Sequence, residues 1–140
     1  MKILAKTTQS TTASPTTIYA LWADIDHWTD HDPGIEWARL TDNFSAGGHY
    51  MLKPKGGPKV KADILVAEPP KRFIDVSRLP GAKLRFDHII TQGNSQTFVT
   101  ITMTLSGPWQ WMWAKILGKN QQADLEQSTA NLIARAEGRS

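Results

Sequence analysis

The sequence predicts an α+β fold in which a curved, seven-stranded antiparallel β-sheet wraps around a long C-terminal α-helix. Between residues 35 and 105, short β-favouring segments alternate with turn residues, which is typical of an antiparallel meander. Residues 106–138 instead place apolar side chains at spacings of three and four, which indicates a helix with one apolar face. A helix of about 28 residues would be about 40 Å long. It needs a partner surface along its whole length, and only the strands can supply one.

One strand and two short helices precede the meander. The segment KILAKTTQST, residues 2–11, is rich in β-favouring residues and predicts the first strand. Ser14 is a suitable N-cap, and Pro15 suits the first position of the helix that follows, because its missing N–H would be unpaired there. A second short helix over residues 24–32 is expected to end at the Pro-Gly pair behind it.

Length and composition describe one ordinary domain over residues 1–140. Hydrophobic residues make up 40% and charged residues 21% of the chain, as in soluble globular domains. No apolar run approaches the roughly 18 residues of a membrane span, and there is no cysteine. We therefore expect a cytoplasmic protein, a monomer or a homodimer, without an integral membrane segment. The net charge of +3 is too small to predict a nucleic-acid partner.

Much of the positive charge lies in KPKGGPKVK, residues 53–61, which holds four lysines around a Pro/Gly turn. Such a loop could attract a phosphate, a coenzyme A tail or an acidic partner. A solvated hairpin loop accounts for it equally simply, because most charge runs are solvated surface.

Turn positions predict which strand residues face the helix. A Pro-Gly turn at residues 80–81 pairs Phe73 with His88, and a turn at residues 93–94 pairs His88 with Val99. A third turn, ahead of Phe73, brings the preceding strand to the same face. The three turns agree on one apolar inner face, made of Val60, Ala62, Ile64, Val66, Phe73, Leu84, Phe86, Val99, Ile101 and Met103.

Four polar residues share this inner face: Tyr50, Asp75, Ser77 and His88. Asp75 and His88 are diagonal cross-strand neighbours in this register, so their side chains are close enough to pair. A buried carboxylate bonded to an imidazole could act in general acid–base catalysis near neutral pH. Equally, each group could simply satisfy the other or a water molecule. A Ser-His-Asp triad is not expected, because Ser77 and Asp75 share a strand and no nucleophile elbow is present.

Two further patterns bear on function. His27 and His31 lie four residues apart among aspartates, but the HEXXH motif is absent and the helix ends at once, so we expect no metal site. Three of the six tryptophans, Trp109, Trp111 and Trp113, cannot all face one side of a helix, because alternate residues diverge by about 200°. At least one must face outward, where it could line a ligand cavity or a partner surface, or simply pack at the helix end.

The order of elements and four segments resemble the START-type helix-grip superfamily (SRPBCC), in its bacterial polyketide cyclase/dehydrase-like branch. The segments are SPTTIYALWADIDHW, GGHYMLKPKGGP, FIDVSRLPGAKLRFDH and SGPWQWMWAKILGK. The resemblance implies a cavity between sheet and helix that holds an apolar or aromatic molecule, with Trp28 and His31 beside its mouth. Related sequences often have W-x-x-W there, and W-T-D-H in this chain makes the mouth more polar.

The sequence therefore favours a protein that binds or transports a small hydrophobic or aromatic molecule of lipid or polyketide type, without a cofactor. The predicted ligand-binding residues are Trp28, His31, Tyr50, Ser77, Phe86, Val99, Ile101, Trp113 and Leu117. The alternative is a polyketide cyclase/dehydrase-type enzyme in which His88 and Asp75 act as acid and base. A third hypothesis assigns the lysine loop and the outward tryptophans to docking on a protein or membrane.

Overall fold

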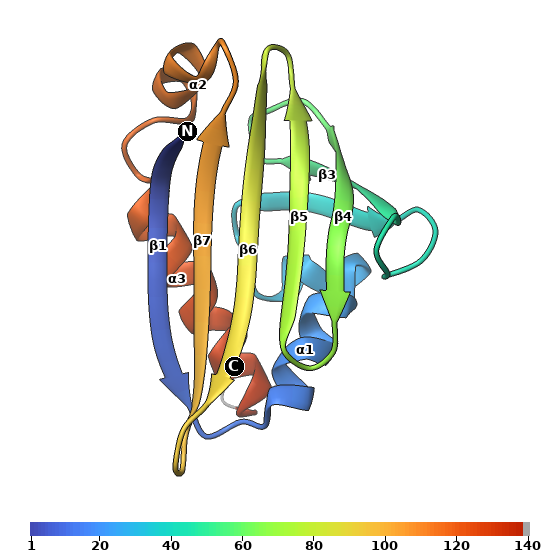
Figure 1. Ribbon diagram of the computed structural model, residues 1–140, viewed down its shortest axis with the longest axis vertical. Coiled ribbons are helices and arrows are strands. Elements are labelled where there is room, and N and C mark those ends of the chain that lie inside the picture. Colours follow the sequence, from blue (N-terminus) through green and yellow to red (C-terminus); the bar gives the residue numbers. More distant parts are fainter. Residues whose placement is uncertain (139–140) are drawn as a thin grey trace.

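The computed structural model of the chain describes residues 1–138 and follows the predicted order of elements (Figure 1). Its strands are β1 (Lys2–Thr11), β2 (Ile35–Leu40), β3 (His49–Pro54), β4 (Val60–Glu68), β5 (Arg72–Leu79), β6 (Ala82–Gln92) and β7 (Thr97–Ser106). Its helices are α1 (Pro15–Ala23), the 3-10 helix η1 (Ile25–Asp30), α2 (Gln110–Leu117) and α3 (Gln121–Ala136).

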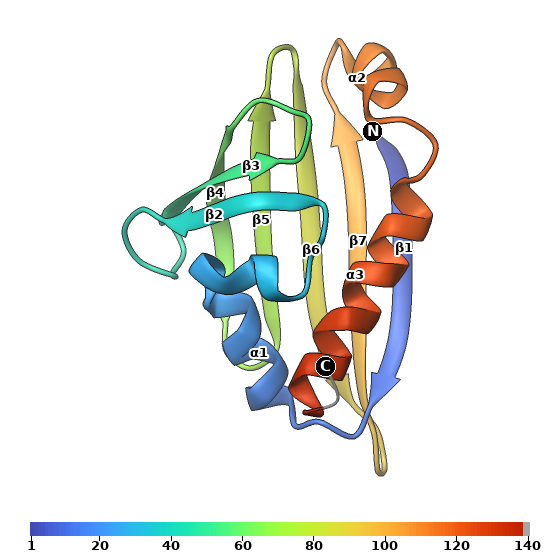
Figure 2. The same ribbon diagram turned by 180° about the vertical axis from the view of Figure 1, so that it is seen from behind.

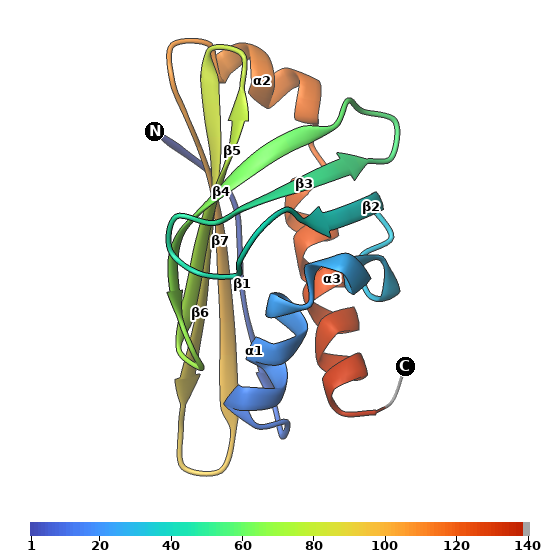
Figure 3. The ribbon, with the colours of Figure 1, turned by 90° about the vertical axis from the view of Figure 1, so that its right-hand side faces the viewer.

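The seven strands form one antiparallel sheet in the order β1-β7-β6-β5-β4-β3-β2. The two strands that flank α1 and η1 in sequence therefore lie at opposite edges of the sheet. The helices gather on one face of it (Figure 2). Seen from the side, β2 and β3 extend over toward α3, so that the sheet curves around the helices (Figure 3). The predicted α+β class and curved seven-stranded sheet are confirmed.

The helices between β1 and β2 form where the sequence indicates. The Ser14 side chain accepts a hydrogen bond from the backbone N–H of Thr17, and Pro15 occupies the first turn of α1. Ile18 and Trp22 are buried on the side that faces the sheet. The second helix, η1, is a 3-10 turn, and the indole N–H of its buried Trp28 donates to the carbonyl of Trp22 at 3.0 Å.

The register of the central strands is close to the predicted one. Phe73 lies opposite His88, and Asp75 opposite Phe86, as expected from the turn at residues 80–81. In the next hairpin His88 lies opposite Ile101 instead of Val99. The turn is longer than predicted, because the N–H of Gly93 bonds the carbonyl of Gln96. A shift of two residues keeps the same side chains facing inward, since strand side chains alternate with a period of two.

The prediction that Val66 faces inward is wrong. The pairing of β4 with β5 shifts between Ile64 and Val66, so that Val66 lies opposite Ile74 and Ala67 opposite Phe73. An extra residue in one strand is a β-bulge, which reverses the inward and outward alternation beyond it.

The prediction of a single C-terminal helix of about 28 residues is also wrong. The segment forms α2 and α3, separated at residues 118–120. Gly118 ends α2 with a φ of +86°, a conformation that glycine adopts without steric penalty. The helix that the sheet holds is thus α3, whose buried residues are Leu125, Thr129, Leu132 and Ile133. No residue of α2 is fully buried.

The shorter helix α2 is attached to the turn between β5 and β6. The N–H of Trp109 donates to the carbonyl of Gly81 at 2.9 Å, and the indole N–H of Trp113 donates to that of Pro80 at 2.7 Å. Gly81 has a φ of +71°, and a Cβ added to it would lie 2.5 Å from the Trp109 ring. The turn therefore needs glycine both for its conformation and for this contact.

We expect Gly81→Ala to lower the free energy of unfolding by about 1–3 kcal/mol, from backbone strain and displacement of the Trp109 ring. Gly56→Ala is the matched control, because Gly56 has a φ of +76° but nothing within 4 Å of an added Cβ. Urea unfolding of both variants separates the two effects. Equal losses of unfolding free energy in Gly81→Ala and Gly56→Ala would show that the Trp109 contact contributes nothing.

Candidate functional site

Aromatic side chains line the inner face of the sheet next to α1 and η1. The imidazole of His88 stacks on the Phe73 ring, with centroids 4.5 Å apart, and meets Trp22 edge-on at 5.1 Å. Trp28 meets Tyr50 edge-on at 5.1 Å. All five of these side chains are buried. The interior of the molecule at this point suits an apolar or aromatic molecule better than a polar one.

A carboxylate lies among these aromatic side chains. Asp75, on β5, is 1% exposed, and its Oδ2 accepts a hydrogen bond from the hydroxyl of Tyr50 on β3. The strand between them carries the small side chain of Ala62, which leaves room for the Tyr50 ring to reach across. The other carboxylate oxygen, Oδ1, has no hydrogen-bond partner in the described part of the chain.

Burial dominates the electrostatics of this pair. Burial raises the pKa of Asp75 from its ordinary 3.8 to about 7, although the Tyr50 hydroxyl partly opposes the shift. Burial, and next the charge of Asp75, raises the pKa of Tyr50 well above its ordinary value. Near neutral pH, Tyr50 is therefore a hydrogen-bond donor, and Asp75 exchanges between an acceptor and a donor form.

The sequence places His88 close enough to pair with Asp75, but in the structure His88 has another partner. Its Nδ1 lies 3.0 Å from the carbonyl oxygen of Phe73, which can only accept, so that Nδ1 carries the proton. Burial lowers the pKa of His88 to about 4. The ring is thus neutral, with Nε2 as a free base. His88 bonds the backbone carbonyl of Phe73, because Phe73 lies directly opposite it. Asp75 bonds Tyr50 instead.

The structure divides the other predicted ligand-binding residues into separate groups. Ser77 and Phe86 lie beside Asp75, the first along β5 and the second opposite it on β6. Val99 and Ile101 are buried on β7, where Ile101 lies opposite His88. Trp113 and Leu117 belong to α2 and pack on the core at the far end of the β5–β6 hairpin.

His31 is bound to the C-terminal helix and not to Asp75. Its Nδ1 accepts a hydrogen bond from Arg135 of α3 at 3.3 Å, and Arg135 also forms an ion pair with Asp30 at 3.4 Å. Burial, and then the charge of Arg135, lowers the pKa of His31 to about 4. His27 is exposed and bonds Asp24 at 2.8 Å. Within residues 1–138, no three His, Asp or Glu side chains form a group that could hold a metal ion.

Two further residues contribute to this interior, of which sequence reasoning missed Phe44 and placed Thr129 in the apolar stripe of the C-terminal helix. Phe44, in the loop before β3, packs on Phe73 with ring centroids 4.7 Å apart. Its loop has no periodicity from which burial could be predicted. Thr129 of α3 is 1% exposed, and its hydroxyl has no partner within residues 1–138. The sequence indicated the burial of Thr129, because this polar residue lies within the apolar stripe of the helix.

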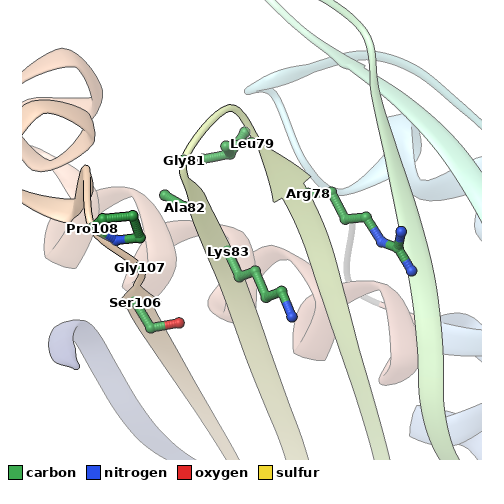
Figure 4. Close-up of a pocket in the computed structure, with 8 residues that line it drawn as sticks. All are labelled: Arg78, Leu79, Gly81, Ala82, Lys83, Ser106, Gly107 and Pro108. Carbon is green, nitrogen blue, oxygen red and sulfur yellow. The ribbon is translucent and has the colours of Figure 1, made fainter.

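Two hollows lie at the surface. One of about 490 Å³ lies at the end of the β5–β6 hairpin, and Arg78 and Lys83 are among the residues that line it (Figure 4). Another of about 290 Å³ is lined in part by Asp32 and Asp124. Neither is lined by Asp75, which is 1% exposed.

Comparisons with known proteins identify the fold. No protein-family model matches the chain, and no curated protein matches it in sequence. A START superfamily protein from Mycobacterium smegmatis is 15% identical with a TM-score of 0.74, over 99% of this chain and 100% of its own. A protein from Thermus thermophilus is 17% identical with a TM-score of 0.74, over 97% and 98% of the two chains.

A point mutant of norcoclaurine synthase from Thalictrum flavum, in complex with a transition-state analogue, is also similar. It is 12% identical with a TM-score of 0.74, over 99% of this chain and 96% of its own. No helix within residues 1–138 is long and apolar enough to cross a membrane. At these low identities the likeness establishes the architecture alone: the chain has the START-type helix-grip fold.

Proposed function

We propose that the protein binds a small, largely apolar molecule beneath the sheet and holds its polar group at Asp75 and Tyr50. One observation carries this proposal: Oδ1 of a carboxylate that is 1% exposed has no hydrogen-bond partner within residues 1–138. Leaving a buried polar group unpaired costs about 1–3 kcal/mol. A ligand that bonds Oδ1 would recover this free energy.

The surroundings of Asp75 favour a ligand with an apolar or aromatic body and one hydroxyl or carbonyl oxygen. Phe73 and Trp28 supply apolar contact. With a pKa of about 7, Asp75 can accept from a ligand hydroxyl or, when protonated, donate to a carbonyl. Lipids and aromatic polyketides combine these features. A norcoclaurine synthase of the same fold was captured with a transition-state analogue, which supports the use of this architecture for binding.

Native mass spectrometry of gently purified protein, with thermal shifts across lipids and aromatic polyketides, tests the proposal. We expect a bound mass or a stabilising compound. Asp75→Asn, which still donates and accepts, should retain binding, whereas Asp75→Leu should weaken it about tenfold or more. Asp87→Asn is the control, because Asp87 pairs with Arg85 away from the interior. No bound mass together with no thermal shift would contradict the proposal.

An acid–base enzyme of the polyketide cyclase/dehydrase type is the second candidate. Two neighbouring groups favour this candidate: Asp75, with a pKa near 7, can donate a proton, and His88, which is neutral, can accept one. In such an enzyme Asp75→Asn would keep ligand binding and lose turnover of a poly-β-ketone substrate. In a binding protein the variant and the wild type would both leave the bound compound unchanged.

A further inference from the structure

An exposed apolar face lies on α2, at the same end of the molecule as the β5–β6 turn (Figures 1 and 3). Trp111 is 63% exposed, Ile116 61% and Trp109 50%. Large apolar side chains are normally scattered singly over a protein surface. These three instead belong to one segment of eight residues, 109–116.

Packing within the molecule does not account for this face. The opposite side of α2 already contacts the core through Trp113, Ala114 and Leu117. At about 100° per residue, Trp111 and Ile116 lie about 140° apart, on the two flanks of the side that faces away from those three, and Lys115 lies between them. A short helix that is apolar on both sides has more apolar surface than the fold needs.

The charge around this face is positive. Lys115 Nζ lies 5.8 Å from the centre of the Trp111 ring, and Lys119 follows the end of α2. Residues 106–123 contain no Asp or Glu. Tryptophan beside lysine is a combination typical of segments that lie at a membrane–water boundary, where the ring enters the headgroup region and the ammonium group meets phosphate.

We propose that α2 docks the protein on the surface of a membrane that contains anionic lipid. The docking face consists of Trp109, Trp111, Lys115, Ile116 and Lys119. Its size favours a membrane over a protein partner, because a two-turn helix about 12 Å long offers much less than the roughly 800 Å² per partner of a stable protein interface. Its charge disfavours a second copy of this chain, since two such faces would bring lysines together. The proposal is independent of the site at Asp75.

Sedimentation with lipid vesicles tests this proposal. We expect the wild-type protein to bind vesicles of phosphatidylcholine mixed with phosphatidylglycerol, and to release them as salt is raised. Vesicles of phosphatidylcholine alone should bind it weakly. Combining Trp111→Ser with Ile116→Ser should lower the partition coefficient about tenfold or more, because two exposed apolar side chains no longer enter the lipid. Lys115→Glu with Lys119→Glu should lower it as well.

Matched controls come from elsewhere on the surface. Leu65 is 47% exposed on β4, so Leu65→Ser removes an exposed apolar side chain outside the docking face. Combining Lys55→Glu with Lys59→Glu reverses two positive charges, as the lysine variant of the docking face does, but in the lysine loop. Both controls should bind vesicles like the wild type. The proposal is overturned if the wild type does not bind anionic vesicles, or if the controls lose binding as much as the α2 variants. Self-association that the α2 changes abolish, without vesicle binding, would assign the face to a second copy.

Discussion

Relative to the wild type, Asp75→Asn is expected to gain about 4 kcal/mol of stability as the pH rises from about 4 to about 8. The folded-state pKa of Asp75 is raised from 3.8 to about 7, so in this range the folded protein binds a proton that the unfolded chain has lost. The contribution of Asp75 to the free energy of unfolding therefore falls with rising pH. Asparagine carries no such proton, so the variant does not undergo this fall.

Denaturant unfolding of both proteins over this pH range measures the difference. His31 and His88, with pKa values lowered to about 4, act in the opposite sense and destabilise the fold as the pH falls below their ordinary 6.5. They are present in both proteins and cancel in the comparison. A difference between wild type and Asp75→Asn that does not change with pH would contradict the raised pKa.

Phe73→Ala is expected to lower the free energy of unfolding by about 3–5 kcal/mol. The Phe73 ring is completely buried and contacts Phe44 and His88. Its removal would leave an apolar cavity next to Asp75, which a small aromatic molecule such as indole could fill. We therefore expect indole to raise the melting temperature of this variant but not that of the wild type.

Phe86→Ala provides the comparison for Phe73→Ala. Phe86 lies on the same face of the sheet but is only half-buried, so its removal should destabilise the protein less and create no closed cavity. Calorimetry with and without indole distinguishes the two variants. Equal losses, or no stabilisation of Phe73→Ala by indole, would show that the interior closes over the space and cannot accommodate a ligand there.

Local signals in the sequence were sufficient for most of the fold. Ser14 and Pro15 marked the start of α1, and the Pro-Gly turn at residues 80–81 placed Phe73 opposite His88 correctly. The bulge beyond Ile64 could not be predicted, because no glycine or proline marks it. The break at Gly118 was visible as a drop in helix propensity of about 1 kcal/mol. Propensity alone did not show that the chain would turn there.

The sequence predicted that four polar residues enter the interior but not which of them pair. Asp75, Ser77, His88 and Tyr50 are all buried, as the alternation of the strands indicated. The partner of Asp75 is nevertheless Tyr50, two strands away, and not His88 on the adjacent strand. Strand register fixes the position of a Cβ atom, whereas the choice of hydrogen-bond partner depends on ring size and on small neighbours such as Ala62.

The pairing of β1 with β7 has a consequence for how the chain folds during synthesis. Residues 2–11 find their partner strand only at residues 97–106, and α3 packs on β1 from still further along. Contacts this distant in sequence are slow to form. Until β7 leaves the ribosome, β1 has no hydrogen-bonded neighbour and β6 has an open edge. This stage of synthesis is when the nascent chain is most open to strand addition by another molecule.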